Sequence, residues 1–153
     1  MGAEDKLNID EAICLAIKHY HRGNFEESED ICRKILKIQP GNAQILHLLG
    51  VICYAFKKYD SAIKYLEESL YFNPSDAEAL YNCGNVFKDN EQFEKAVACY
   101  KRALQFDTHN PYIFVNLGYV LGKKGDPGEA VRCYREGLRQ KYERSCEKYF
   151  FAL

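Results

Sequence analysis

Small residues recur in this sequence at a fixed interval of 34 positions, and this period restricts the fold more than any other feature. The recurring small residues are Gly50, Gly84 and Gly118 in one column and Ala62, Ala96 and Ala130 in another. One further step back in each column gives Ala16 and Ser28, which are also small. The register runs without insertion or deletion from about Ile9 to Arg144. Such a period is typical of a protein built from stacked repeats.

Each 34-residue unit contains two stretches with the apolar spacing of an amphipathic helix. In the second unit these apolar residues are Leu46, Leu49, Ile52 and Cys53, then Tyr59, Ile63, Leu66 and Leu70. A short polar turn separates the two stretches in every unit: Arg22-Gly23-Asn24, Lys57-Lys58, Asn90-Glu91-Gln92 and Gly125-Asp126-Pro127. Each unit is therefore predicted to be a helical hairpin.

Three kinds of residue predict how these hairpins are built. Asp126 suits an N-cap, with Pro127 at the first helical position after it. The small columns, such as Gly50 and Ala62, are expected where two helices approach so closely that a larger side chain would separate them. Pro40 and Pro74 cannot continue a helix and are expected to end their units.

These columns resemble the tetratricopeptide repeat family. The family's first-helix pattern is matched by Leu46, Leu49 and Gly50, by Leu80, Cys83 and Gly84, and by Phe114, Leu117 and Gly118; its second-helix pattern is matched by Tyr59, Ala62, Leu66 and Ser69, by Phe93, Ala96, Tyr100 and Ala103, and by Ala130, Tyr134 and Gly137. The resemblance implies an all-α, right-handed superhelical solenoid of four helical hairpins. Their expected bounds are 9–42, 43–76, 77–110 and 111–144, after a leader at 1–8. Thr108 and Tyr142 depart from the closing proline, and Pro127 replaces an aromatic residue.

Residues 145–153 are expected to form either a capping extension of the last helix or the truncated first helix of a fifth repeat. They carry the bulky apolar residues Tyr149, Phe150, Phe151 and Leu153. Repeat proteins usually end in a polar-faced cap, so we expect these side chains to dock on the last hairpin. A homo-oligomer formed through this C-terminal helix is the alternative.

The resemblance implies that a protein or peptide partner binds in a concave groove lined by the first helices. The groove residues expected in the first two units are Ile13, Ile17, Tyr20, His47, Leu48, Val51 and Tyr54. Those expected in the last two units are Tyr81, Asn82, Asn85, Tyr112, Asn116 and Tyr119, with Val115 and Lys123 beside them. Exposed aromatic groups are common at interaction sites.

Two groove chemistries known in the family can be compared with these residues. Members that bind a C-terminal carboxylate use a fork of Lys and Arg, and no such fork falls at the corresponding positions here. The helical-repeat region of the intracellular O-linked N-acetylglucosamine transferase instead grips a peptide backbone with asparagines repeated once per unit. Asn82 and Asn116 match that ladder, whereas Cys14 and Leu48 do not. Two solvated asparagines are the alternative interpretation.

The composition of the chain argues against some classes of binding partner and favours one kind of cellular compartment. A net charge of −1 lacks the basic excess of a nucleic-acid surface. No apolar run is long enough to cross a bilayer. The seven cysteines include no Cys-x-x-Cys pair, and six lie in helical apolar patterns, which predicts free packed thiols in a reducing, cytoplasmic setting rather than a disulfide framework.

No pattern of residues predicts catalysis. His19 and His21 stand two apart on a helix and cannot share a metal, and no phosphate loop or nucleophile elbow is present. We therefore expect no catalytic residue, metal site or cofactor, and a protein–protein interaction module. The alternatives are a self-assembling scaffold and the repeat region of a larger enzyme such as a glycosyltransferase of the type named above.

Overall fold

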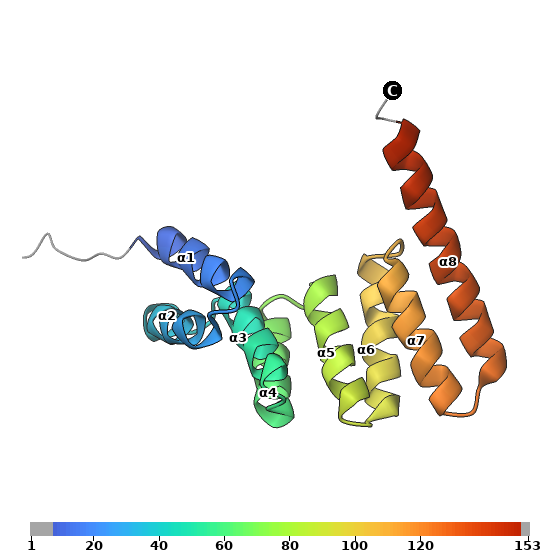
Figure 1. The fold of residues 1–153 in the computed structure, drawn as a ribbon. Helices are drawn as coiled ribbons and strands as arrows, with labels where there is room; N and C mark the ends of the chain where they lie inside the picture. The colour runs from blue at the N-terminus through green and yellow to red at the C-terminus, as the bar shows by residue number, and fades with distance from the viewer. Residues whose placement is uncertain (1–7, 151–153) are drawn as a thin grey trace, which may run out of the picture. The chain divides into compact units, whose positions relative to one another are not determined.

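The computed structural model describes residues 8–150, and their side chains as far as residue 143. Within these residues the chain forms eight helices and no strand (Figure 1). The helices are α1 (Ile9–His21), α2 (Phe25–Ile38), α3 (Ala43–Ala55), α4 (Tyr59–Phe72), α5 (Ala77–Asp89), α6 (Phe93–Phe106), α7 (Pro111–Lys123) and α8 (Pro127–Phe150). The predicted all-helical architecture of helix pairs is confirmed.

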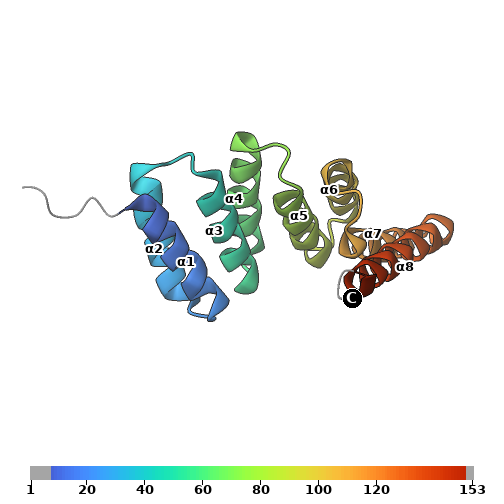
Figure 2. The ribbon, with the colours of Figure 1, turned by 90° about the horizontal axis from the view of Figure 1, so that it is seen from above.

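The helices fall into two compact units, Met1–Pro74 and Ser75–Leu153. In the N-terminal unit, α1 packs on α2 and α3 packs on α4, while α2 also contacts α3. In the C-terminal unit, α5 packs on α6 and α7 packs on α8, while α6 also contacts α7. Figure 2 shows α1 beside α2 and α7 beside α8 from a second direction. Each unit is thus a pair of stacked helical hairpins.

Short polar side chains begin the first helix of each hairpin. Asn42 Oδ1 accepts a hydrogen bond from Ile45 N at 3.1 Å, and Asp76 Oδ1 accepts from Ala79 N at 3.0 Å. The second helix of the fourth hairpin is capped as well, because Asp126 Oδ1 accepts from Glu129 N at 3.0 Å; this carboxylate therefore caps α8 as the sequence predicted. These bonds satisfy amide groups that have no partner within their helix.

The glycine column lies where the two helices of a hairpin touch. A Cβ atom on Gly50 would be 2.6 Å from Leu66 Cγ, and one on Gly84 would be 2.5 Å from Tyr100 Cε1. On Gly118 it would be 3.0 Å from Tyr134 Cε1. The prediction of close helix approach at these positions is therefore confirmed.

The last helix continues past the end of the fourth predicted repeat. α8 extends from Pro127 to Phe150 without a break, so residues 145–150 prolong it rather than form a separate helix. The side chains of Tyr149 and Phe150, together with Phe151 and Leu153, lie outside the described residues. The surface on which these groups dock stays a prediction.

The cysteines differ in exposure more than the apolar pattern indicated. Cys32, Cys53 and Cys83 are buried and Cys99 and Cys133 are half-buried, but Cys14 is exposed on α1. The expectation of a packed thiol is therefore wrong for Cys14, because its side chain lines a surface hollow on α1 instead of packing in the core. Cys146 lies beyond the described side chains. All six described cysteines are free thiols.

In the native protein, Cys14 should react with an alkylating reagent and Cys32 should not. Burial raises the pKa of the Cys32 thiol to about 11, and the thiolate is the form that attacks. Iodoacetamide at pH 8 should therefore label Cys14 and leave Cys32 unmodified until urea is added, as read by peptide mass spectrometry. Equal labelling rates for these two cysteines in the native protein would contradict the described burial of Cys32.

Candidate partner-binding surface

The expected groove residues of the N-terminal unit lie mostly against its core. Ile13, Ile17 and Tyr20 are half-buried and pack on the core cluster that α1, α2 and α3 share. Leu48 belongs to that cluster, with 9% of its surface exposed, so little of this side chain is open to a partner, and its place in the groove lining stays a prediction. Its apolar side chain gains more from contact with its core neighbours than from water.

Tyr20 takes part in an aromatic cluster at the turn end of the N-terminal unit. Its ring centroid lies 5.6 Å from that of Phe25, and Phe25 lies 5.7 Å from Phe56. The Lys58 ammonium stands 5.3 Å from the centre of the Phe56 ring. This cluster joins the two hairpins, which gives Tyr20 a packing role.

Three further expected residues, His47, Val51 and Tyr54, follow one another along α3 and are half-buried. The Tyr54 ring lies 6.3 Å from that of Tyr59 across the turn. These three side chains expose less surface on α3 than the tyrosines expose on α7, the equivalent helix of the C-terminal unit.

In the C-terminal unit, α7 exposes a stripe of large side chains. Tyr112 is 63% exposed, Val115 42% and Tyr119 45%. Their spacing of three and four residues places them on one face of the helix. Lys123 continues this face, with its ammonium 5.6 Å from the centre of the Tyr119 ring. Exposed aromatic residues gathered in this way make this face of α7 a candidate interaction surface.

A network of polar side chains lies beside this stripe and joins three helices. Asn116 Nδ2 on α7 donates to Tyr81 Oη and to Asn85 Oδ1 on α5, both at 3.0 Å. Tyr100 Oη on α6 donates to the same Asn85 oxygen at 2.8 Å. The rings of Tyr81 and Tyr100 lie 6.0 Å apart. The network therefore fixes the side chains of α5 and α7 relative to each other.

The network changes the expected role of Asn116. An asparagine amide has two N–H hydrogens, and Asn116 uses both within the protein. Only its carbonyl oxygen remains for a ligand, so Asn116 is not a ladder rung that offers both a donor and an acceptor. Asn82, the other expected rung, is half-buried on α5.

Sequence reasoning did not include Tyr100 in the site. Tyr100 lies on the second helix of its hairpin, in a column whose side chains point toward the first helix of the same hairpin. Leu66 and Cys32 occupy the equivalent positions in earlier repeats. Its ring is fully buried, as the column predicts. Only its hydroxyl group, which those neighbours lack, connects the core to the polar network.

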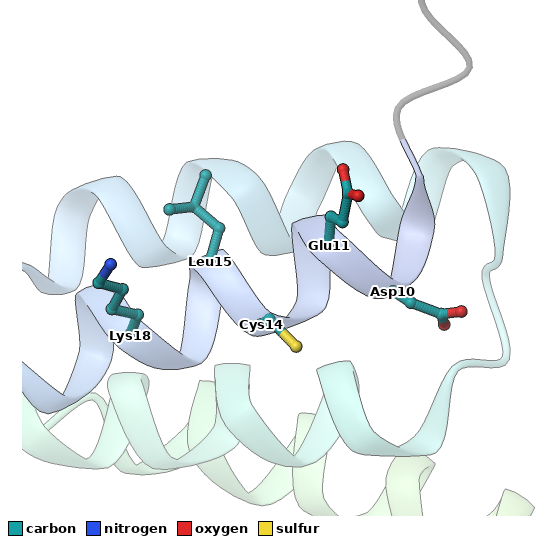
Figure 3. A pocket seen from close by; sticks show the side chains of 5 residues that line it. All are labelled: Asp10, Glu11, Cys14, Leu15 and Lys18. Carbon is teal, nitrogen blue, oxygen red and sulfur yellow. The ribbon is translucent and has the colours of Figure 1, made fainter.

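A second surface feature is a hollow on the exposed face of α1. Asp10, Glu11, Cys14, Leu15 and Lys18 line it, and Figure 3 shows these side chains along the helix. One repeat later, the positions of Glu11 and Lys18 hold Ile45 and Ile52, both fully buried. Charged side chains at these two positions give α1 a polar outer face, and their mixed signs select no particular charged ligand.

Two absences hold for the part of the chain that the structure describes. No helix there combines the length and the apolar character needed to cross a membrane. Within the same residues, no group of three or more His, Cys, Asp or Glu side chains could hold a metal ion.

Family models match the repeats seen in both units. Two models described as tetratricopeptide repeat match residues 8–70 and 111–143, and a model described as TPR repeat matches residues 84–125. The chain belongs to the tetratricopeptide repeat family. Membership in this family supports a role in protein–protein interaction or as a scaffold.

Several solved structures share the fold. A crystal structure of MamA matches with a TM-score of 0.86 and 19% identity, over 92% of this chain and 82% of that one. MamA from Desulfovibrio magneticus RS-1 matches with a TM-score of 0.81 and 21% identity, over 88% of this chain and 76% of that one. At such identity the likeness shows the fold alone. The search of curated proteins gave no match.

Proposed function

We propose that this tetratricopeptide repeat chain binds a peptide segment of another protein on the face formed by α5 and α7. The observation that carries the proposal is the exposed stripe of Tyr112, Val115 and Tyr119 beside the ordered polar network. We propose that His47, Val51 and Tyr54 on α3 give the N-terminal unit a smaller surface of the same kind.

Energetics support the tyrosine stripe as the main contact. Tyrosine buries a large area on binding while only a few torsions are immobilised, and it is enriched among residues that dominate interfaces. Free tyrosine rings exposed to water gain more from a partner than half-buried isoleucines already packed on a core. The face offers no cluster of like charge, so the partner is selected by shape and hydrogen bonding.

We infer no catalytic activity of the chain's own, because the face joins tyrosine, asparagine and aliphatic groups without a nucleophile and a base. The buried free thiols support a reducing, cytoplasmic compartment.

Alanine substitutions on α7 should weaken partner binding. A partner is first captured from cell extract and identified by mass spectrometry, then purified for calorimetric titration. Tyr119→Ala and Tyr112→Ala should each raise the Kd about tenfold, the typical cost of removing an interface anchor. Tyr71→Ala, which removes an exposed tyrosine on α4, serves as the matched control. If both α7 variants bind as tightly as that control, the proposed face is wrong.

Self-association is a second candidate function, and the exposed face of α8 favours it. Leu138 is 67% exposed and Tyr142 72%, with Val131 on the same side. Leu104, the equivalent of Leu138 one repeat earlier, is half-buried on α6, which packs on α7. Light scattering after size-exclusion chromatography decides this candidate: a mass that falls from dimer to monomer in Leu138→Ser supports it, and a monomer for the unchanged protein refutes it.

A further inference from the structure

We propose that the outer side of the last hairpin, formed by α7 and α8, binds an amphipathic helix of another protein. The bound helix would lie where the first helix of a further repeat would pack. We call this surface the end face, and its lining residues are Val115 and Tyr119 on α7 and Val131, Tyr134 and Leu138 on α8. The inference goes beyond the proposed function, because the ligand is a helix and its site lies between α7 and α8.

The lining residues of the end face are more exposed than their equivalents one repeat earlier. On the end face these side chains are between 37% and 67% exposed. The equivalent residues of α5 and α6 are all buried or half-buried: Tyr81, Asn85, Val97, Tyr100 and Leu104. The helix α7 packs on α6 and also contacts α5 (Figure 1). In the C-terminal unit, no helix of the described part of the chain packs on α7 and α8 in the same way.

The difference in exposure is confined to the side that a further helix would cover. Leu117, which faces the interior of the last hairpin, is 4% exposed, and its equivalent Cys83 is 2% exposed. Ala130 is likewise 4% exposed, and Ala96 is fully buried. The last hairpin is therefore packed internally as tightly as the one before it, and only its outer apolar side is left open. Burying that side would be favourable.

The apolar side chains of α7 and α8 adjoin along the end face, because glycines let the two helices approach closely. A Cβ on Gly118 would be 3.0 Å from Tyr134 Cε1, and one on Gly137 would be 3.1 Å from Val115 Cγ2. The Tyr134 ring and the Val115 side chain therefore lie at the contact between the helices, and Leu138 follows Gly137 on α8. The end face is thus one continuous apolar surface on two helices.

The molecule itself shows which kind of helix packs on such a surface. In the N-terminal unit, α3 contributes Ile45, Leu49 and Ile52, all fully buried, to the core cluster that it shares with α1 and α2. The equivalent residues of α7, which are also buried, are Ile113, Leu117 and Val120. These side chains have the spacing i, i+4 and i+7, which places them on one face of a helix. The ligand is therefore a helix with aliphatic residues at this spacing.

The two end helices of a second copy of this chain fit that pattern poorly. α1 has Glu11 and Lys18 where α3 and α7 have fully buried aliphatic residues. α8 offers Val131 and Leu138 seven residues apart, but Arg135 stands between them at the i+4 position. Burying an unpaired charge is costly. A helix of another protein is therefore favoured over a second copy, and the test below decides between the two occupants.

The test uses two fluorescein-labelled peptides of about 18 residues, long enough to be partly helical in water. The first carries Ile, Leu and Val at i, i+4 and i+7 in a background of alanine, lysine and glutamate. The second has Glu and Lys in place of the Ile and the Val, which is the arrangement on α1. Fluorescence anisotropy measures binding to the full chain, and the first peptide should bind at least about tenfold more tightly.

Leu138→Ser should raise the Kd of the first peptide about tenfold, since a buried leucine is lost from the contact. Val131→Ser should raise it severalfold. Ile38→Ser on α2 is the matched control, because Ile38 is 61% exposed and Leu138 is 67% exposed. This control should leave the Kd unchanged. Circular dichroism and thermal melting establish that each variant is folded.

Tyr112→Ala separates this inference from the proposed function. Glu78, the equivalent of Tyr112 one repeat earlier, is exposed although α7 contacts α5, so Tyr112 lies outside the end face. The substitution should weaken the partner bound on the face of α5 and α7 and leave the Kd of the helical peptide unchanged.

Two results would overturn the inference and leave the proposed function standing. The first is an equal Kd for the two peptides, or no greater loss of binding in Leu138→Ser than in Ile38→Ser. The second is a dimer that Leu138→Ser dissociates, as read by light scattering, together with no peptide binding to the unchanged protein. That second result would assign the end face to another copy of this chain.

Discussion

Replacing Gly84 with alanine is expected to lower the free energy of unfolding by about 2–3 kcal/mol, the upper part of the range for overpacking a core. The added Cβ would lie 2.5 Å from Tyr100 Cε1 and 2.7 Å from Cδ1, which is closer than two such carbons approach. Tyr100 cannot move aside easily, because its ring is fully buried and its hydroxyl donates to Asn85. The helices α5 and α6 must therefore separate.

Urea unfolding followed by circular dichroism measures this effect, and Gly122→Ala is its control. Gly122 also lies in a helix, but a Cβ there would meet only Ala130 Cβ, at 3.8 Å. That substitution should raise stability by about 0.5–1 kcal/mol, since alanine is the better helix former. If Gly84→Ala were as stable as Gly122→Ala, the close approach of α5 and α6 at this glycine would be refuted.

The repeat period made the helix pairs and the close approach at the glycines predictable. A column that holds Gly50, Gly84 and Gly118 constrains helix separation directly, since each added side chain would collide with a residue of the partner helix. The exposed tyrosines of α7 were predictable for a related reason. Tyr112 and Tyr119 lie off the columns that build the core, where a large side chain has no internal place.

The polar network was not predictable from the sequence. Asn116 and Tyr81 are 35 residues apart, and their hydrogen bond depends on the distance between α5 and α7, which periodicity does not give. The position of a residue within the repeat also does not predict its burial where the side chains of one column differ in polarity. Leu48 and Asn116 share a column, yet Leu48 is buried in the core and Asn116 bonds across to α5.

The turns inside the four hairpins share one backbone feature that the polar composition alone did not reveal. A residue with positive φ recurs every 34 positions: Gly23 at 79°, Lys57 at 58°, Glu91 at 56° and Gly125 at 85°. The amide after Gly23 bonds back to His19 O at 3.0 Å, and the amide after Lys57 bonds to Cys53 O at 2.9 Å. These are Schellman helix ends, in which the left-handed position favours glycine.

Alanine in place of both Gly23 and Gly125 is expected to lower the free energy of unfolding by about 2–3 kcal/mol in total, because a left-handed conformation costs an L-residue about 1–2 kcal/mol. A Cβ on either glycine would meet nothing within 4 Å. The loss would therefore report backbone conformation alone, unlike the collision at Gly84. Urea unfolding of each single variant gives the separate contributions.

Glycine in place of Lys57 or Glu91 should increase the free energy of unfolding instead of lowering it. These residues already carry the left-handed strain, so Lys57→Gly and Glu91→Gly should each raise stability by about 0.5 kcal/mol, the strain relieved exceeding the added freedom of the unfolded chain. Each unit contains one glycine and one non-glycine residue at this turn position, so every unit supplies its own control. A loss of stability in both glycine variants, or no loss in the alanine variants, would show that the turns do not require the left-handed conformation.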